Sequence, residues 1–276
     1  MDNFIGDFIS KSLIDYELIE KWNYKFCASN LPICPRQLML GRFYEKTKHE
    51  RLVPFTQKYS FHVGQAIHSL VQDTWSRQSI LWGDWKCLDK DCGVKYSNTQ
   101  LPEGKCIRCG HSARYIEKEV EDMATGFTGR CDAVVFCEEL DGYLVYELKS
   151  RNINIINNVI DPYLSDIYQV SHYATLLSRK YWLRIVGRVI LWLGKPKPKP
   201  YKYWYYPGIG EELVDEQFKL KLDMDKKVSE GRVLEVTGRC NTFEDTNGCL
   251  FAGICLSPSR DRLVEEEYQG WLRCQK

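Results

Sequence analysis

The sequence predicts an α/β or α+β fold in which helices flank a mixed sheet. Three observations predict it: apolar residues at helical spacing in several segments, apolar runs typical of strands between those segments, and their order along the chain. The order helix, strands, helix, strand is typical of such folds. With 276 residues, the chain can bury a full core, as a single domain (1–276) that carries insertions.

Each element follows from the local pattern of apolar residues. The helices expected from this spacing are residues 4–30, 60–75, 165–182 and 211–228. The strands expected from apolar, β-favouring runs are residues 126–136, 143–149, 184–194 and 201–206. The dipeptide Asp141-Gly142 is typical of a hairpin turn between the first two strands. Residues 82–112 break the helical period and look inserted.

The composition is that of an ordinary soluble globular protein, with 44% hydrophobic and 27% charged residues and a net charge of +1. No uninterrupted apolar run is long enough to span a bilayer, and the N-terminus MDNFIGDFISK lacks a basic-then-apolar signal pattern. We therefore expect a cytoplasmic protein with no membrane partner.

The charge is unevenly distributed, because residues 167–210 contain no acidic residue but eight basic and ten aromatic ones. Cations that track phosphates, interleaved with rings that stack on bases, suit a nucleic-acid groove. A core strand followed by a solvated polar loop is the alternative interpretation. The candidate nucleic-acid-binding residues are Arg179, Lys180, Lys195, Lys197, Lys199, Lys202, Tyr203 and Trp204.

Two carboxylates and a lysine occur on the two strands that the hairpin joins. Glu147 and Lys149 are two positions apart in GYLVYELKSR (142–151), so in a strand they share one face. Asp132 lies inside the preceding apolar run, where a carboxylate without a partner is costly to bury. If the three converge, a divalent cation such as Mg²⁺ or Mn²⁺ would neutralise the carboxylates. An ion pair at the rim of the sheet is the alternative.

Four motifs in order, GQAIH (64–68), GRCD (129–132), ELK (147–149) and QVSHY (169–173), resemble those of the RecB-type branch of the PD-(D/E)XK nucleases. The resemblance implies a restriction-endonuclease-like core, a mixed central sheet flanked by helices, and metal-dependent hydrolysis of DNA. It also implies roles for individual residues. Mg²⁺ or Mn²⁺ would be held by His68, Asp132, Glu147 and the backbone carbonyl of Leu148; Lys149 would orient or deprotonate water; Gln169 and Tyr173 would steady the site and line the substrate path. Glu119 and Glu121 are candidates for one more ligand or for a solvated strand edge.

The chain has twelve cysteines and no secretory signal, which indicates metal binding and not a disulfide framework. Cys87, Cys92, Cys106 and Cys109 have the spacing C-x4-C, thirteen residues, C-x2-C, which is typical of a zinc ribbon with four thiolates around Zn²⁺. His111 is a candidate substitute ligand. We therefore expect residues 82–113 to form an inserted module with a structural role.

A second, dispersed group consists of Cys34, Cys240, Cys249 and Cys255. It resembles the iron–sulfur members of the RecB branch, such as the AddB helicase–nuclease subunit and the CRISPR-associated exonucleases. The resemblance implies a 4Fe-4S cluster that joins residue 34 to residues 240–255. Eight residues separate Cys240 from Cys249, where the family has two, so Cys27 or Cys274 could replace Cys240. Zinc could also replace the cluster.

The function expected from these features is a DNA exonuclease that acts on single strands or DNA ends, in recombination, repair or CRISPR spacer processing. Recombination, helicase or CRISPR adaptation proteins are its candidate partners. The alternative is a non-catalytic DNA-binding platform or accessory subunit of a helicase complex, against which the complete set of Asp132, Glu147 and Lys149 speaks. A nuclease directed at RNA is a third interpretation.

Overall fold

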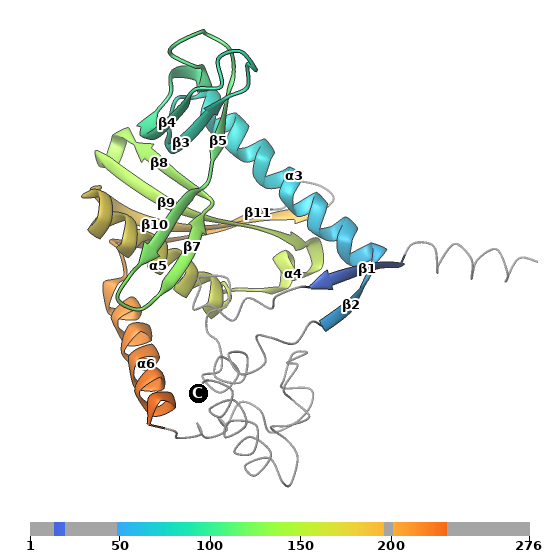
Figure 1. The fold of residues 1–276 in the computed structure, drawn as a ribbon, viewed down its shortest axis with the longest axis vertical. Helices are drawn as coiled ribbons and strands as arrows, with labels where there is room; N and C mark the ends of the chain where they lie inside the picture. The colour runs from blue at the N-terminus through green and yellow to red at the C-terminus, as the bar shows by residue number, and fades with distance from the viewer. Residues whose placement is uncertain (1–13, 20–48, 196–200, 231–276) are drawn as a thin grey trace, which may run out of the picture.

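A mixed seven-stranded sheet forms the centre of the molecule (Figure 1). The computed structural model describes residues 14–19, 49–195 and 201–230. The strands follow the order β11 (Tyr201–Pro207), β10 (Ile185–Lys195), β9 (Gly142–Asn152), β8 (Ala133–Cys137), β3 (Leu81–Cys87) and β4 (Lys95–Gln100), and β5 (Ala113–Ile116) also pairs with β3. Strands β9 and β10 are parallel and the other pairs of this sheet are antiparallel. The described part of the chain has the mixed α+β fold that the sequence predicts.

The parallel pair requires a crossover connection, which two helices supply. Helix α4 (Ile153–Asn158) follows β9 directly, and α5 (Leu164–Tyr181) leads back to β10. The side chain of Asn152 caps α4 by accepting a hydrogen bond from the backbone N–H of Asn154 (2.9 Å). Helices α3 (Phe55–Arg77) and α6 (Glu211–Ser229) precede and follow this arrangement along the chain. None of the described helices is both long and apolar enough to cross a membrane.

Strand β9 presents alternate side chains to two helices, as the period of a strand requires. Lys149 hydrogen-bonds to Gln169 of α5. On the opposite face, Tyr146 packs against Trp75 of α3, with 4.7 Å between the ring centroids. The even-numbered residues of β9 therefore face α3, and the odd-numbered ones face α5.

The main hydrophobic core lies between the sheet and helices α5 and α6. Val145 of β9 and Ile190 of β10 are fully buried there against Val170 and Leu177 of α5, and Phe218 of α6 closes the cluster. Each such side chain contributes roughly 1.5–3 kcal/mol relative to an exposed one. This packing holds β9 and α5 together, and both carry candidate site residues.

The predicted hairpin forms, and the strand expected at residues 126–136 divides into two. Strand β8 continues into β9 through a short 3₁₀ turn (Glu138–Leu140) and Asp141, whose φ of 46° is left-handed. Strand β7 (Phe127–Cys131) instead pairs with β6 (Lys118–Asp122) in a separate two-stranded sheet. Asp132 lies at the break between β7 and β8, so its side chain is not part of either strand's regular alternation.

The helix expected at residues 4–30 is wrong for residues 14–19. These form β1 (Ile14–Ile19), which pairs antiparallel with β2 (His49–Pro54). In IDYELI, apolar residues alternate with acidic ones, and this period of two is typical of a strand. Figure 1 shows β1 and β2 at one end of α3 and β3, β4 and β5 at the other. The remaining residues of the expected helix lie outside the described part of the chain.

Candidate active site

Two buried carboxylates meet where β8 and β9 pair. The antiparallel register joins Ala133 to Tyr146, so Asp132, just before the first, lies opposite Glu147, just after the second. The Asp132 side chain turns back to this pair, because its Oδ2 accepts a hydrogen bond from the backbone N–H of Leu148 (2.7 Å). Asp132 is 9% exposed and Glu147 is 1% exposed.

Burial of these carboxyl groups makes their charged forms unfavourable. It raises the pKa of Asp132, an effect to which the charge of Glu147 adds. Burial also raises the pKa of Glu147 to about 7, against the opposing effect of Lys149. The Oε2 atom of Glu147 has no hydrogen-bond partner among the described residues. A buried pair of this kind needs a counter-charge, and a divalent cation would provide it.

Helix α3 brings His68 to Asp132. The distance from His68 Nδ1 to Asp132 Oδ1 is 3.7 Å. Burial lowers the pKa of His68, an effect to which Lys149 adds, so the ring is neutral at pH 7 and a nitrogen can bind a metal. Gly64 allows the approach: a Cβ at this position would lie 2.8 Å from Ser150 Oγ on β9. The GQAIH motif therefore combines a close helix–strand contact with a candidate ligand one turn later.

Glu117 completes a cluster that sequence reasoning missed. It lies between β5 and β6, and one ligand atom each from His68, Glu117 and Asp132 lie within 4.8 Å of one another. Of the acidic residues considered from the sequence, Glu119 is 80% exposed and pairs with Arg130 at 3.7 Å. Glu121 is exposed as well. The three glutamates alternate in EKEVED, and no local signal distinguishes the first from the others.

Lys149 is held by two partners on the α5 face of β9. Its Nζ lies 2.5 Å from Glu147 Oε1 and donates a hydrogen bond to Gln169 Oε1 at 3.0 Å. Gln169 Nε2 in turn donates to the hydroxyl of Tyr173 (3.0 Å), one turn further along α5. Burial alone would lower the pKa of Lys149, but the charge of Glu147 prevails and leaves this pKa raised. The motifs ELK and QVSHY thus form one hydrogen-bonded chain.

The four cysteines of the ribbon segment converge. Cys87 Sγ lies 3.5 Å from Cys109 Sγ, Cys92 Sγ lies 3.7 Å from Cys106 Sγ, and all four sulfurs lie within 4.8 Å of one another. In a tetrahedral zinc site, Zn–S bonds of about 2.3 Å put the sulfurs about 3.8 Å apart. This cysteine group could hold a metal ion. His111 does not join it and lies 3.5 Å from Asp89.

The ribbon segment is continuous with the central sheet. Strand β3 pairs with β8 through Leu81 and Trp82, and its last residue, Cys87, is the first of the four cysteines. Gly93 and Gly110 each follow the second cysteine of a pair and have positive φ (52° and 75°), which lets the chain turn back around the sulfurs. The segment is therefore anchored at the end of the sheet next to β8.

The described candidates for nucleic-acid contact do not share one surface. Arg179 pairs with Glu211 and Asp215 of α6, and Lys180 lies over the ring of Tyr181. The other cations and the tryptophan bond to backbone carbonyls: Lys195 to Ser60 (2.7 Å), Lys202 to Val159 (2.5 Å) and Trp204 to Ile160 (3.0 Å). Tyr203 is 66% exposed on the other face of β11. Lys197 and Lys199 lie outside the described residues.

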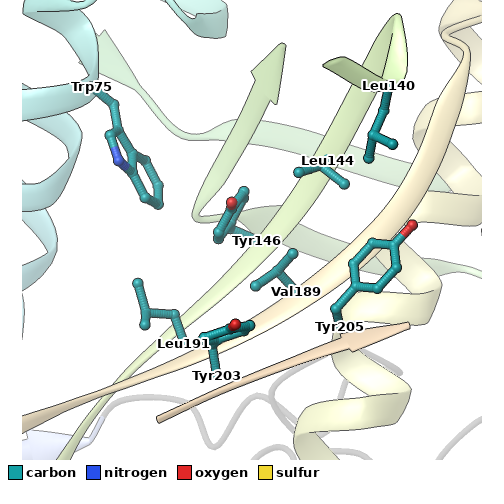
Figure 2. Close-up of a pocket in the computed structure, with 8 residues that line it drawn as sticks. All are labelled: Trp75, Leu140, Leu144, Tyr146, Val189, Leu191, Tyr203 and Tyr205. Carbon is teal, nitrogen blue, oxygen red and sulfur yellow. The ribbon is translucent and has the colours of Figure 1, made fainter. Parts of the chain in front are cut away.

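An apolar hollow of 470 Å³ lies on the α3 side of the sheet (Figure 2). It is lined by Trp75, Leu140, Leu144, Tyr146, Val189, Leu191, Tyr203 and Tyr205. Tyr146 belongs to the face of β9 opposite Glu147 and Lys149, so the hollow and the carboxylate pair are on different sides of this strand.

The cysteines expected to hold an iron–sulfur cluster, Cys34, Cys240, Cys249 and Cys255, lie outside the described residues, as do Cys27 and Cys274. Of the cysteines outside both groups, Cys131 is buried in the main core, and Cys137 is partly buried at the end of β8.

No protein-family model matches the chain, and no curated protein matches it. Among solved structures, the chain is similar to the crystal structure of SSO0001, with 12% identity and a TM-score of 0.44 over 93% of this chain and 97% of that one. It is also similar to LHK-Exo in complex with dAMP, with 12% identity and a TM-score of 0.41 over 75% of this chain and 91% of that one. Likenesses this distant do not define an activity.

Proposed function

We propose that the protein is a metal-dependent nuclease that hydrolyses phosphodiester bonds, and that it acts as an exonuclease on single-stranded DNA or DNA ends. The observation that carries the proposal is the cluster of ligand atoms that includes His68 and Asp132, with the buried Glu147 and its partner Lys149 on the adjacent strand. An ion pair at a sheet rim would need neither two carboxylates at one buried point nor a neutral imidazole beside them.

The residues present fit a divalent cation. Carboxylate oxygens suit Mg²⁺ and Mn²⁺, and the unpartnered Oε2 of Glu147 is a buried acceptor without a donor among the described residues. His68, Asp132, Glu147 and the carbonyl of Leu148 would hold the ion. When bound, it would supply positive charge that offsets the charge on the scissile phosphate and favours deprotonation of water.

Lys149 supplies the second positive charge of the site. Because its pKa is raised, the side chain is an ammonium at neutral pH. An ammonium donates hydrogen bonds and does not remove a proton, so Lys149 orients water or a phosphate oxygen. Gln169 fixes the position of Nζ, and Tyr173 fixes Gln169.

The remaining assignments extend this proposal. We propose a structural Zn²⁺ at Cys87, Cys92, Cys106 and Cys109, and a 4Fe-4S cluster at Cys34, Cys240, Cys249 and Cys255. We also propose that Tyr203 stacks on bases and that the lysines of residues 195–202 track phosphates, which requires Lys195 and Lys202 to leave the backbone carbonyls of Ser60 and Val159. Recombination, helicase or CRISPR adaptation proteins would be the partners.

The test is degradation of end-labelled single-stranded DNA, and of RNA of the same sequence, by the full chain in Mn²⁺. We expect shortening of the DNA by the wild type, and a rate reduced by about a hundredfold or more in Asp132→Ala, which removes a ligand. Lys219→Ala, at an exposed position on α6, is the matched control and should keep the wild-type rate. The proposal would be refuted if the wild type degraded no nucleic acid, or if Asp132→Ala degraded the DNA as fast as the wild type. Wild-type protein that binds DNA without cutting it would favour the non-catalytic platform.

A further inference from the structure

The carboxylate of Glu117 lies with His68 and Asp132, outside the four motifs. We propose that Glu117 binds the same divalent cation directly, and that Gln72 of α3 holds it in the position to do so. This inference rests on the proposed metal-dependent function and adds a ligand, and a residue that positions it, to that site.

The distances suit a shared cation. Ligand atoms of His68, Glu117 and Asp132 lie within 4.8 Å of one another. At bond lengths of about 2.1 Å, two ligands on opposite sides of one ion are about 4.2 Å apart. Small side-chain movements therefore suffice to bring all three to one ion, with no change in the backbone.

Gln72 links Glu117 to the strand that carries Asp132. Its Nε2 donates a hydrogen bond to the backbone carbonyl of Asp132 (2.8 Å) and another to Glu117 Oε1 (3.3 Å). Both hydrogens of the amide are used, and Gln72 is 9% exposed. A carboxylate fixed through one oxygen presents the other to an ion, which is how residues behind a metal ligand commonly orient it.

The position of Gln72 beside Asp132 and Glu117 follows from the spacing of residues along α3. Gly64, His68 and Gln72 follow one another at intervals of four, so they lie on one face of α3. Gly64 contacts β9, His68 approaches Asp132, and Gln72 bridges Asp132 and Glu117. One stripe of the helix thus supplies a close contact, a ligand and a support for a second ligand.

Glu119, in the same segment, provides a comparison with a glutamate that is not a proposed metal ligand. It is two residues away, its side chain is 80% exposed, and it pairs with Arg130. If Glu117 served only as an acceptor for Gln72, its replacement by an amide would leave metal binding unchanged.

The experiment is a titration of the full chain with Mn²⁺ alone, in which free Mn²⁺ is measured by electron paramagnetic resonance. Glu117→Gln keeps the shape and an oxygen that accepts from Gln72, so the fold is retained, and it should raise the Kd for Mn²⁺ by about tenfold or more. Gln72→Ala should raise it by about ten- to a hundredfold. The matched control Glu119→Gln should leave it unchanged.

An unchanged Kd in Glu117→Gln, or an equal increase in Glu119→Gln, would overturn the inference. If Glu117→Gln does not fold, as judged by circular dichroism, an unchanged Kd in Gln72→Ala overturns it instead. Failure of the nuclease proposal is a separate outcome. In that case the wild type would cut no DNA, although its Mn²⁺ binding would still depend on Glu117.

Discussion

Glu147 and Lys149 illustrate how one strand can supply half of the candidate site. Their spacing directs both side chains toward α5, where Lys149 donates a hydrogen bond to Gln169 and Glu147 is buried. The sequence predicts this pair, because the period of a strand is regular. It does not predict Glu117 and Gln72. Their contact depends on how a helix and a loop 45 residues apart meet in space.

The titration of Glu147 predicts how pH affects the metal-free protein. Burial raises its folded pKa to about 7, above the ordinary 4.5. A carboxyl group with a raised folded pKa contributes stability that is fully present below the unfolded pKa and is lost as the pH rises through the folded one. The contribution of Glu147 to the free energy of unfolding should therefore fall between about pH 4.5 and pH 7, whereas the lowered pKa values of His68 and His172 act in the opposite direction.

Urea unfolding of protein that retains zinc but lacks Mg²⁺ and Mn²⁺ measures this. Relative to the wild type, the stability of Glu147→Gln should increase as the pH rises over this range. The comparison with the variant is needed because Asp132, Glu117, His68 and His172 also have shifted pKa values and change the stability with pH. Identical pH profiles for wild type and Glu147→Gln would show that Glu147 is not the group responsible.

At the scale of elements, α3 and β9 must approach closely for His68 to reach the site. Gly64→Ala would place a methyl group 2.8 Å from Ser150 Oγ, so the Ser150 side chain must rotate or the helix must shift. We expect a loss of stability of about 1–3 kcal/mol and weaker Mn²⁺ binding. Ser150→Ala removes the oxygen and leaves the Cβ of residue 150 at 4.0 Å from the new methyl group. The double variant should therefore regain most of the lost stability and most of the lost Mn²⁺ affinity. Thermal unfolding and the Mn²⁺ titration check this, and a double variant no better than Gly64→Ala would contradict the account.

The cysteine ribbon is the second element with a testable role. One Zn²⁺ per ribbon is expected, and Cys106→Ser should lose it, because three thiolates and a hydroxyl bind zinc far more weakly than four thiolates. Tyr96, whose hydroxyl lies 3.1 Å from Cys106 Sγ, lowers the pKa of that thiol to about 6, which favours the thiolate. Inductively coupled plasma mass spectrometry of the purified wild type and Cys106→Ser measures the zinc bound per chain. Wild-type zinc content in Cys106→Ser, in protein with all other metals removed, would exclude this site.

At the scale of the molecule, the sequence predicts α3, α5, α6, β9, β10 and β11, because their periods or apolar runs are long and regular, but it does not predict α4 or the strands β3 to β6. Two further features could not be predicted from the spacing of apolar residues alone. In the short strand β1 the alternation covers only residues 14–18, and helix spacing can be found in the same stretch. The break at Asp132 follows from strand pairing, because β6 pairs with the first half of the segment (β7) and β9 pairs with the second half (β8). That break places Asp132 between two sheets, where neither strand's alternation would have put it.

The central claim is that a cation site and Lys149 together hydrolyse phosphodiester bonds. The most direct measurement is the single-turnover cleavage rate of end-labelled single-stranded DNA at saturating Mn²⁺, for wild type, Lys149→Ala and Lys219→Ala. The account predicts equal rates for wild type and Lys219→Ala, and a rate lower by about a hundredfold or more for Lys149→Ala. A wild type that does not cleave, or a Lys149→Ala variant that cleaves as fast as the wild type, would contradict it.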